Sequence, residues 1–148
     1  MRLETSTHLP VPPEDAWRTL LRWEEQSEWI RDADSVRVLT EHREGLGVRI
    51  AVRNRVFNVP TFTEELEVTG WDPPRRLQMT HMSFIHGTGT WKLDPEAGGT
   101  RFRWVEDVSL PIRVLGEIAL WVYRPFLLHL MRGAMRDLRA FVVRPESR

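Results

Sequence analysis

A long amphipathic segment closes this chain and limits the folds that it can adopt. The segment runs from about Pro111 to Val143 and has apolar residues at steps of three and four, which is typical of one face of a helix. A helix of about 30 residues is roughly 45 Å long and cannot bury such a face on itself. It must lie against the structure formed by the preceding residues. The predicted inward stripe consists of Leu115, Ala119, Val122, Phe126, Leu130, Ala134, Leu138 and Phe141.

The preceding residues predict a sheet with two short helices near its start. Residues 2–10 alternate weakly, as an edge strand does, and Pro12 and Pro13 then favour a helix start. A second short helical piece covers Glu24–Ile30. From Ser35 to Leu110 the apolar residues recur every second position between turns at residues 44–47, 58–60, 70–74 and 94–99, which predicts about six more strands.

These elements together predict an α+β fold. We expect a curved antiparallel sheet of about seven strands wrapped around the long C-terminal helix, with two short helices after the first strand. No repeat or linker interrupts the 148 residues, so a single domain, 1–148, is expected.

Composition excludes several classes of protein. The 21 basic residues balance the 21 acidic ones, whereas nucleic-acid binders usually carry a basic excess. The chain has no cysteine, which excludes disulfides and thiol catalysis. The N-terminus is polar, and the apolar stretch 115–131 is interrupted by Glu117, Arg124, Pro125 and His129. We therefore expect no secretion signal, no stable membrane insertion and a cytoplasmic location.

A sheet curved around one helix tends to leave a hollow between them, and apolar hollows bind apolar ligands. The seven tryptophans, against a single tyrosine, either fill a wide core or line such a cavity. The residues expected to line it are Val52, Asn54, Phe62, Leu66, Met79, Trp91 and Trp104 from the strands, and Leu115, Ala119, Val122 and Phe126 from the helix.

Polar residues on the expected inner faces are the candidates for chemistry. Glu64, His81 and Glu106 share these faces with Asn54. His81 with Glu64 or Glu106 could form a general acid/base pair, which needs no metal, cofactor or nucleophile. Alternatively, the carboxylates lie in water near the mouth or pair with an arginine, and His81 bonds only within the sheet. A register shift of one residue would turn any of them outward. The five histidines show no spacing typical of a metal site.

Three apolar residues fall at strand ends beside loops, namely Phe57, Phe84 and Ile85. They could form an apolar gate to the cavity. They could equally anchor their loops or form a dimer contact, so either a monomer or a homodimer is compatible with them.

Three local motifs resemble one superfamily. They are Val11-Pro-Pro-Glu-Asp-Ala-Trp17, Gly70-Trp-Asp-Pro-Pro-Arg-Arg-Leu77, and Gly89-Thr-Trp-Lys-Leu93 followed by Gly99-Thr-Arg101. With the order of elements, they resemble the START-like or Bet v 1-like (SRPBCC) superfamily and its polyketide cyclase/dehydrase and lipid-transport group. The resemblance implies the helix-grip fold with a cavity entrance ringed by the loops near 58–60, 84–86 and 109–113. Members bind lipids, sterols, polyketides or quinones, and some are enzymes.

Three functions remain in competition. The first is a carrier or sequestering protein for a hydrophobic small molecule, such as a lipid, a quinone or a polyketide, which requires only the cavity. The second is a cofactor-free polyketide cyclase, aromatase or dehydratase that uses the inward acid/base residues. The third is an interaction protein that docks a partner through an exposed apolar patch. Fold alone does not decide between them.

Overall fold

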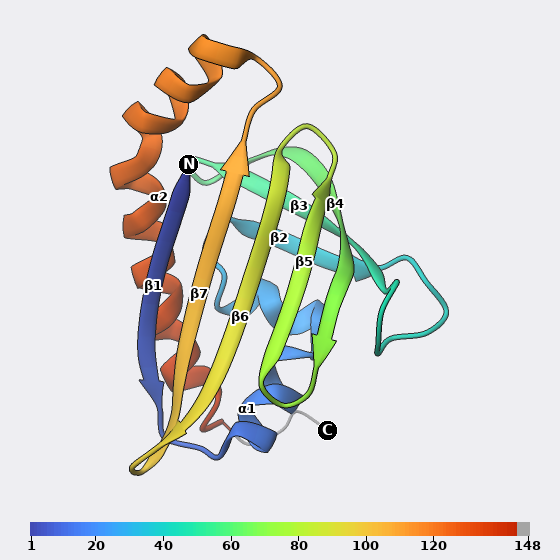
Figure 1. Cartoon of the computed structure of the whole chain (residues 1–148), viewed down its shortest axis with the longest axis vertical. Helices are drawn as coiled ribbons and strands as arrows, with labels where there is room; N and C mark the ends of the chain where they lie inside the picture. Colours follow the sequence, from blue (N-terminus) through green and yellow to red (C-terminus); the bar gives the residue numbers. More distant parts are fainter. Residues whose placement is uncertain (145–148) are drawn as a thin grey trace.

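A computed structural model describes residues 1–144, and the last four residues of the expected domain, 145–148, lie outside the described residues. Seven antiparallel strands form one curved sheet around the long helix α2 (Figure 1). The strand order is β1-β7-β6-β5-β4-β3-β2. The elements are β1 (Arg2–Leu9), α1 (Pro13–Leu20), the 3-10 helix η1 (Trp23–Glu28), β2 (Ala33–Val38), β3 (Arg49–Val56), β4 (Val59–Asp72), β5 (Arg76–Met82), β6 (His86–Glu96), β7 (Gly99–Ser109) and α2 (Arg113–Phe141).

The predicted α+β helix-grip fold is confirmed, including the two short helices after the first strand. One turn is misplaced in the prediction, because β4 continues to Asp72 although a turn was expected to begin at Gly70. The strand continues past a register shift between Val68 and Gly70. A Cβ at residue 70 would lie 2.8 Å from Cβ of Gln78, so the glycine here serves close packing between strands rather than a turn.

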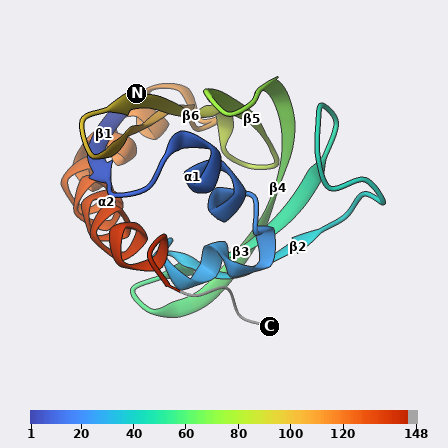
Figure 2. The same cartoon turned by 90° about the horizontal axis from the view of Figure 1, so that it is seen from below.

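One end of the molecule is closed by α1 and η1. Pro13 begins α1, whose residues Ala16, Trp17 and Leu20 are buried. Seen from below, α1 lies across the opening between the sheet and α2 (Figure 2). Trp23 of η1 is fully buried, and its indole N–H donates to the backbone carbonyl of Arg43. Because large apolar side chains fill this end, it forms the packed part of the core.

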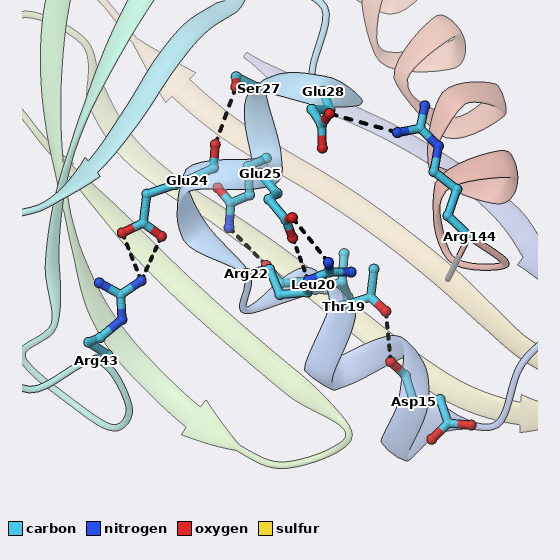
Figure 3. A network of polar contacts seen from close by, with 11 residues as sticks. Asp15, Thr19, Leu20, Arg22, Glu24, Glu25, Ser27, Glu28, Arg43 and Arg144 are labelled. Atoms are coloured by element: carbon cyan, nitrogen blue, oxygen red, sulfur yellow. Dashed lines mark hydrogen bonds and ion pairs between the residues drawn. The ribbon is translucent and has the colours of Figure 1, made fainter. Parts of the chain in front are cut away.

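Ion pairs fix η1 in this position (Figure 3). Arg43 of the β2–β3 loop donates to Glu24, with Nη2 2.6 Å from Oε2. Arg144, beyond the end of α2, pairs with Glu28 at 3.7 Å. Between these surface pairs, buried Gln26 donates to the backbone carbonyl of Leu20 at 2.9 Å. The 3-10 helix is therefore tied to the loop before β3, to α1 and to the C-terminal end of α2.

The two halves of α2 differ in what they bury. Ala134, Leu138 and Phe141 are buried in the core, as the stripe predicts. In the first half the predicted face is wrong, because Leu115 and Val122 are 70 % and 77 % exposed and Ala119 is exposed as well. The inward face here lies one residue later along the chain and consists of Gly116, Leu120 and Leu127, with Leu130 and Met131 continuing it.

The error has a physical cause. Residues 114–122 are apolar on nearly every side of the helix, since Val114, Ile118 and Trp121 accompany the predicted stripe and are exposed. Periodicity singles out a face only where polar residues occupy the opposite face. Two adjacent stripes therefore fit this sequence equally well.

By length and composition, Val114–Phe141 could cross a membrane, with a mean hydropathy of 1.3 over its most apolar window. Core helices of soluble proteins meet the same criterion. The second half of α2 contributes Ala134, Leu138 and Phe141 to the core, although only 17 % of the most apolar window of the helix is buried.

Candidate functional site

A cavity lies between the sheet and α2, toward the end of the molecule at which α2 begins. Its inner space has a volume of about 190 Å³ and its outer space about 540 Å³. The two spaces adjoin, because Asp32, Asn54 and Glu64 line both of them together with Ile85 and leucines of α2. The outer volume falls within the roughly 300–1,000 Å³ of small-molecule pockets, and most of the inner wall is apolar.

Most of the predicted strand residues line this cavity. Val52, Asn54, Leu66, Met79, Trp91 and Trp104 line the inner space, and Phe62 lines the outer one. Leu115, Ala119 and Val122 do not line it, because they lie on the exposed face of α2. Phe126 instead borders a neighbouring hollow together with Phe57. The helix contributes Leu120, Leu127 and Leu130 to both spaces.

The three candidate acid/base residues meet in the inner cavity. The Nδ1 atom of His81 bonds to Oε1 of Glu64, and its Nε2 atom lies 3.0 Å from Oε2 of Glu106. The side chains are largely buried, with His81 8 %, Glu64 9 % and Glu106 18 % exposed. The imidazole therefore bridges two carboxylates, where the sequence predicted a pair with one or the other.

Glycines in β6 allow the side chains of His81 and Glu106 to contact each other. His81 on β5 and Glu106 on β7 are separated by β6, and two strand spacings amount to about 10 Å. On β6, Gly87 pairs with His81 and Gly89 pairs with Glu106. A Cβ at residue 89 would lie 2.7 Å from Oε1 of Glu106. The carboxylate thus occupies the space over β6 that a side chain would fill.

Two further side chains complete the network. Asn54 Nδ2 donates to Oε2 of Glu64 at 3.2 Å and to the backbone carbonyl of Val52 at 3.3 Å. The Trp104 indole N–H donates to Oε1 of Glu106 at 2.8 Å. Each of the four carboxylate oxygens therefore accepts one hydrogen bond. The network fixes both carboxylates in place, since charge-assisted hydrogen bonds are the stronger kind.

This geometry requires an imidazolium. An ionised carboxylate only accepts, so His81 must donate from both ring nitrogens to satisfy Glu64 and Glu106. Burial lowers the pKa of His81, but the hydrogen bonds to Glu106 and Glu64 and their charges outweigh it and raise the pKa to about 10. At neutral pH His81 is therefore the cation between the two carboxyl groups.

The sequence prediction missed a fourth titratable residue, Asp32, which lies between η1 and β2. It borders the inner space, the outer space and the neighbouring hollow. Burial, together with the nearby negative charges of Glu64 and Glu106, raises its pKa to about 6, and only a hydrogen bond with its own backbone opposes this. Asp32 follows a short helix without strand alternation, so no face could be assigned to it from the sequence.

Two of the three proposed gate residues line the outer space, and the third, Phe57, lines the neighbouring hollow. Phe84 and Ile85 line the outer space from the β5–β6 turn. Phe57 lies at the tip of the β3–β4 hairpin, where both turn residues have positive φ, 50° for Phe57 and 65° for Asn58. Its ring packs against Phe126 of α2 at 5.2 Å between centroids. The hairpin tip is thus attached to α2 beside the cavity.

Within residues 1–144, no group of three histidine, aspartate or glutamate side chains is arranged to hold a metal ion. The Glu64–His81–Glu106 arrangement uses both imidazole nitrogens for hydrogen bonds, which leaves neither as a ligand.

Comparison with known proteins places the chain among related sequences and folds. The model of the family described as "Polyketide cyclase / dehydrase and lipid transport" matches residues 1–141. No curated protein matches the chain.

Similar solved structures include TTHA0849 from Thermus thermophilus, with 20 % identity, a TM-score of 0.78 and coverage of 97 % of each chain. The Zhui aromatase/cyclase from Streptomyces sp. R1128 has 13 % identity and a TM-score of 0.75, with 96 % of this chain and 93 % of that chain covered. The di-domain aromatase/cyclase StfQ of the steffimycin biosynthetic pathway has 17 % identity and a TM-score of 0.74, with 95 % of this chain and 50 % of that chain covered.

Proposed function

The chain belongs to the polyketide cyclase/dehydrase and lipid transport family, and we propose that it binds a hydrophobic small molecule in the cavity between the sheet and α2, as a carrier or sequestering protein. The observation that carries this proposal is the cavity itself. Apolar side chains such as Leu66, Met79 and Trp91 form most of its inner wall, and burying apolar ligand surface against them is favourable by about 25 cal/mol per Å².

The arrangement of the core supports binding as well. The closed end of the molecule is filled by fully buried side chains such as Trp23 and Leu138, so the fold does not need to collapse the other end to be stable. Phe62 and Phe84 beside the outer space are 39 % and 57 % exposed. They provide apolar surface over which a ligand could enter.

Native mass spectrometry of the gently purified protein tests this proposal, followed by extraction and identification of whatever is bound. A stoichiometric lipid, quinone or polyketide is the expected result. The cavity-filling variant Val52→Trp should lose this ligand, because Val52 lines the inner space. The matched control Val122→Trp adds the same side chain on the exposed face of α2 and should keep it. Equal retention in both folded variants would place the ligand outside the cavity.

A second candidate is proton-transfer catalysis on a polyketide-like substrate, and the buried Glu64–His81–Glu106 network favours it. Both His81 N–H groups are engaged, so His81 would act by stabilising the carboxylates. A carboxylate would remove a proton from the carbon beside a ketone, and the resulting enolate would attack a second carbonyl of the same chain, whose alkoxide takes the proton back. Such a cyclisation is redox-neutral and needs no co-reactant.

Single turnover of a poly-β-ketone analogue by Glu106→Gln distinguishes this candidate from simple binding. A catalytic role predicts at least a hundredfold loss of cyclisation with binding retained. The control Glu65→Gln changes an outward residue that pairs with Arg49 and should have no effect. Cyclisation by neither the parent protein nor the variants would leave ligand binding as the function.

A further inference from the structure

We propose that the cavity selects a hydrophobic ligand that carries a protonated amine, in preference to one that carries a carboxylate or a phosphate. This inference rests on the proposed binding function and adds the charge of the ligand to it. It is carried by three carboxylates and a single cation that surround the apolar space, and by the direction in which their hydrogen bonds run.

The charged side chains that line the inner space are Asp32, Glu64, His81 and Glu106. His81 offsets one of the three negative charges. Arg55 borders the outer space and the neighbouring hollow but not the inner space, and its Nε lies 3.0 Å from Oδ1 of Asp34. Among the described residues, no other lysine or arginine lines either space. The interior is therefore negative, and its low polarity strengthens the effect of each charge.

The hydrogen-bond network also leaves acceptors, and not donors, for a ligand. The N–H groups of His81 and Trp104 donate to the carboxylates, and Asn54 Nδ2 donates to Glu64 and to the Val52 carbonyl. Each carboxylate oxygen has accepted one hydrogen bond and can accept a second. A ligand ammonium would supply the missing donors. A ligand carboxylate beside Glu64 and Glu106 would face further acceptors, and its burial there would be unfavourable.

Asp32 indicates where the amine would lie. With Glu64 it lines the junction of the inner and outer spaces, and no side chain of residues 1–144 donates a hydrogen bond to its carboxylate. An ammonium at this junction would be next to both acids. The apolar part of the ligand would then extend inward to Trp91 and Trp104, whose indole faces attract cations as well as apolar groups.

Three matched bicyclic probes test the inference: 1-naphthylmethylamine, 1-naphthylmethanol and 1-naphthoate, titrated calorimetrically at pH 8 and low salt. We expect the amine to bind at least tenfold more tightly than the alcohol, and the carboxylate to bind most weakly. Equal affinities, or a preference for the carboxylate, would overturn the inference and leave the binding function intact. No binding of any of the three would overturn both.

Two isosteric variants locate the effect. Asp32→Asn should reduce the preference for the amine over the alcohol about tenfold. Asp107→Asn removes the same charge from the exposed neighbour of Glu106 and should leave the preference as it is. If both variants reduce it equally, net charge and not the cavity explains the selectivity, and the inference fails.

Discussion

The two ends of the space between sheet and helix contrast sharply. At the closed end, Trp23, Phe102 and Leu138 have no measurable exposure, and α1 and η1 complete a dense core. At the open end, Leu127 and Leu130 of the same helix border a cavity and stay partly exposed. The same sheet and the same helix are therefore packed at one end and hollow at the other.

The contrast indicates that the closed end stabilises the fold, whereas the open end provides the binding site. Close packing is worth most where it is complete, and the closed end has it. At the open end, the polar network holds the cavity wall in shape where hydrophobic packing is absent. Changes at the closed end should thus affect unfolding, whereas changes at the open end should depend on pH and on ligand.

The largest loss of stability should come from replacing His81, the cation of the open end. In His81→Leu, Glu64 and Glu106 would keep their hydrogen bonds from Asn54 and Trp104 but lose the cation between them. Breaking a buried ion pair costs about 3–5 kcal/mol. We expect a loss of this size in the free energy of unfolding at pH 8, measured in urea.

The parent protein provides the matching pH test. His81 has a pKa of about 10 when folded and about 6.5 when unfolded. Its contribution to stability is therefore complete below pH 6.5 and is lost as the pH rises through 10. His81→Leu should lack this decline. A decline of equal size in the variant would mean that the network does not hold its charge as described.

A matched pair of truncations in α2 compares the two ends directly. Leu138→Ala at the closed end should cost about 3 kcal/mol, because it creates a cavity in a filled core. Leu127→Ala should cost about 1 kcal/mol, because Leu127 already borders empty space and buries less apolar surface. Urea unfolding of both variants measures the difference. Equal losses would contradict the contrast between a packed and a hollow end.

The sequence predicted the strands better than the helix, and the reason is physical. In β7, Phe102, Trp104 and Glu106 alternate with polar residues, so the inward face follows from the period of two. This is why the Glu64–His81–Glu106 cluster could be anticipated, although not its bridging geometry, which depends on Gly89 and on pairing across β6. Residues 114–122 of α2 offered no such polar contrast.

Asp32 was unpredictable for a different reason. It lies in a connection between η1 and β2, where no periodicity assigns a direction to a side chain. Its importance comes entirely from residues distant in the sequence, since Glu64, Glu106 and Tyr123 share the same cavity. Such sites follow from tertiary structure and not from a local pattern.

The last predicted effect on stability is a gain. The titratable groups that share a cavity or the neighbouring hollow with Asp32 come from the sheet, α2 and the chain beside it: Glu64, His81, Glu106, Tyr123, His129, Arg31 and Arg55. Its pKa is raised from 3.8 to about 6, so the folded state binds the proton more tightly than the unfolded state. The charge of Asp32 therefore begins to oppose folding as the pH rises above 3.8, and its destabilising effect is complete above about pH 6. Asp32→Asn should stabilise the protein by about 2 kcal/mol at pH 8 and should have little effect at pH 3.5.

Asp107→Asn serves as the control for this gain, because Asp107 is exposed on the outer face of β7 and should give no comparable change. Unfolding in urea at both pH values measures the two variants side by side. The gain in stability of Asp32→Asn could disappear when ligand is added. This outcome would mean that the carboxylate that destabilises the empty cavity is also the one that binds the ligand. A loss of stability at pH 8 would instead make Asp32 a structural part of the cavity wall.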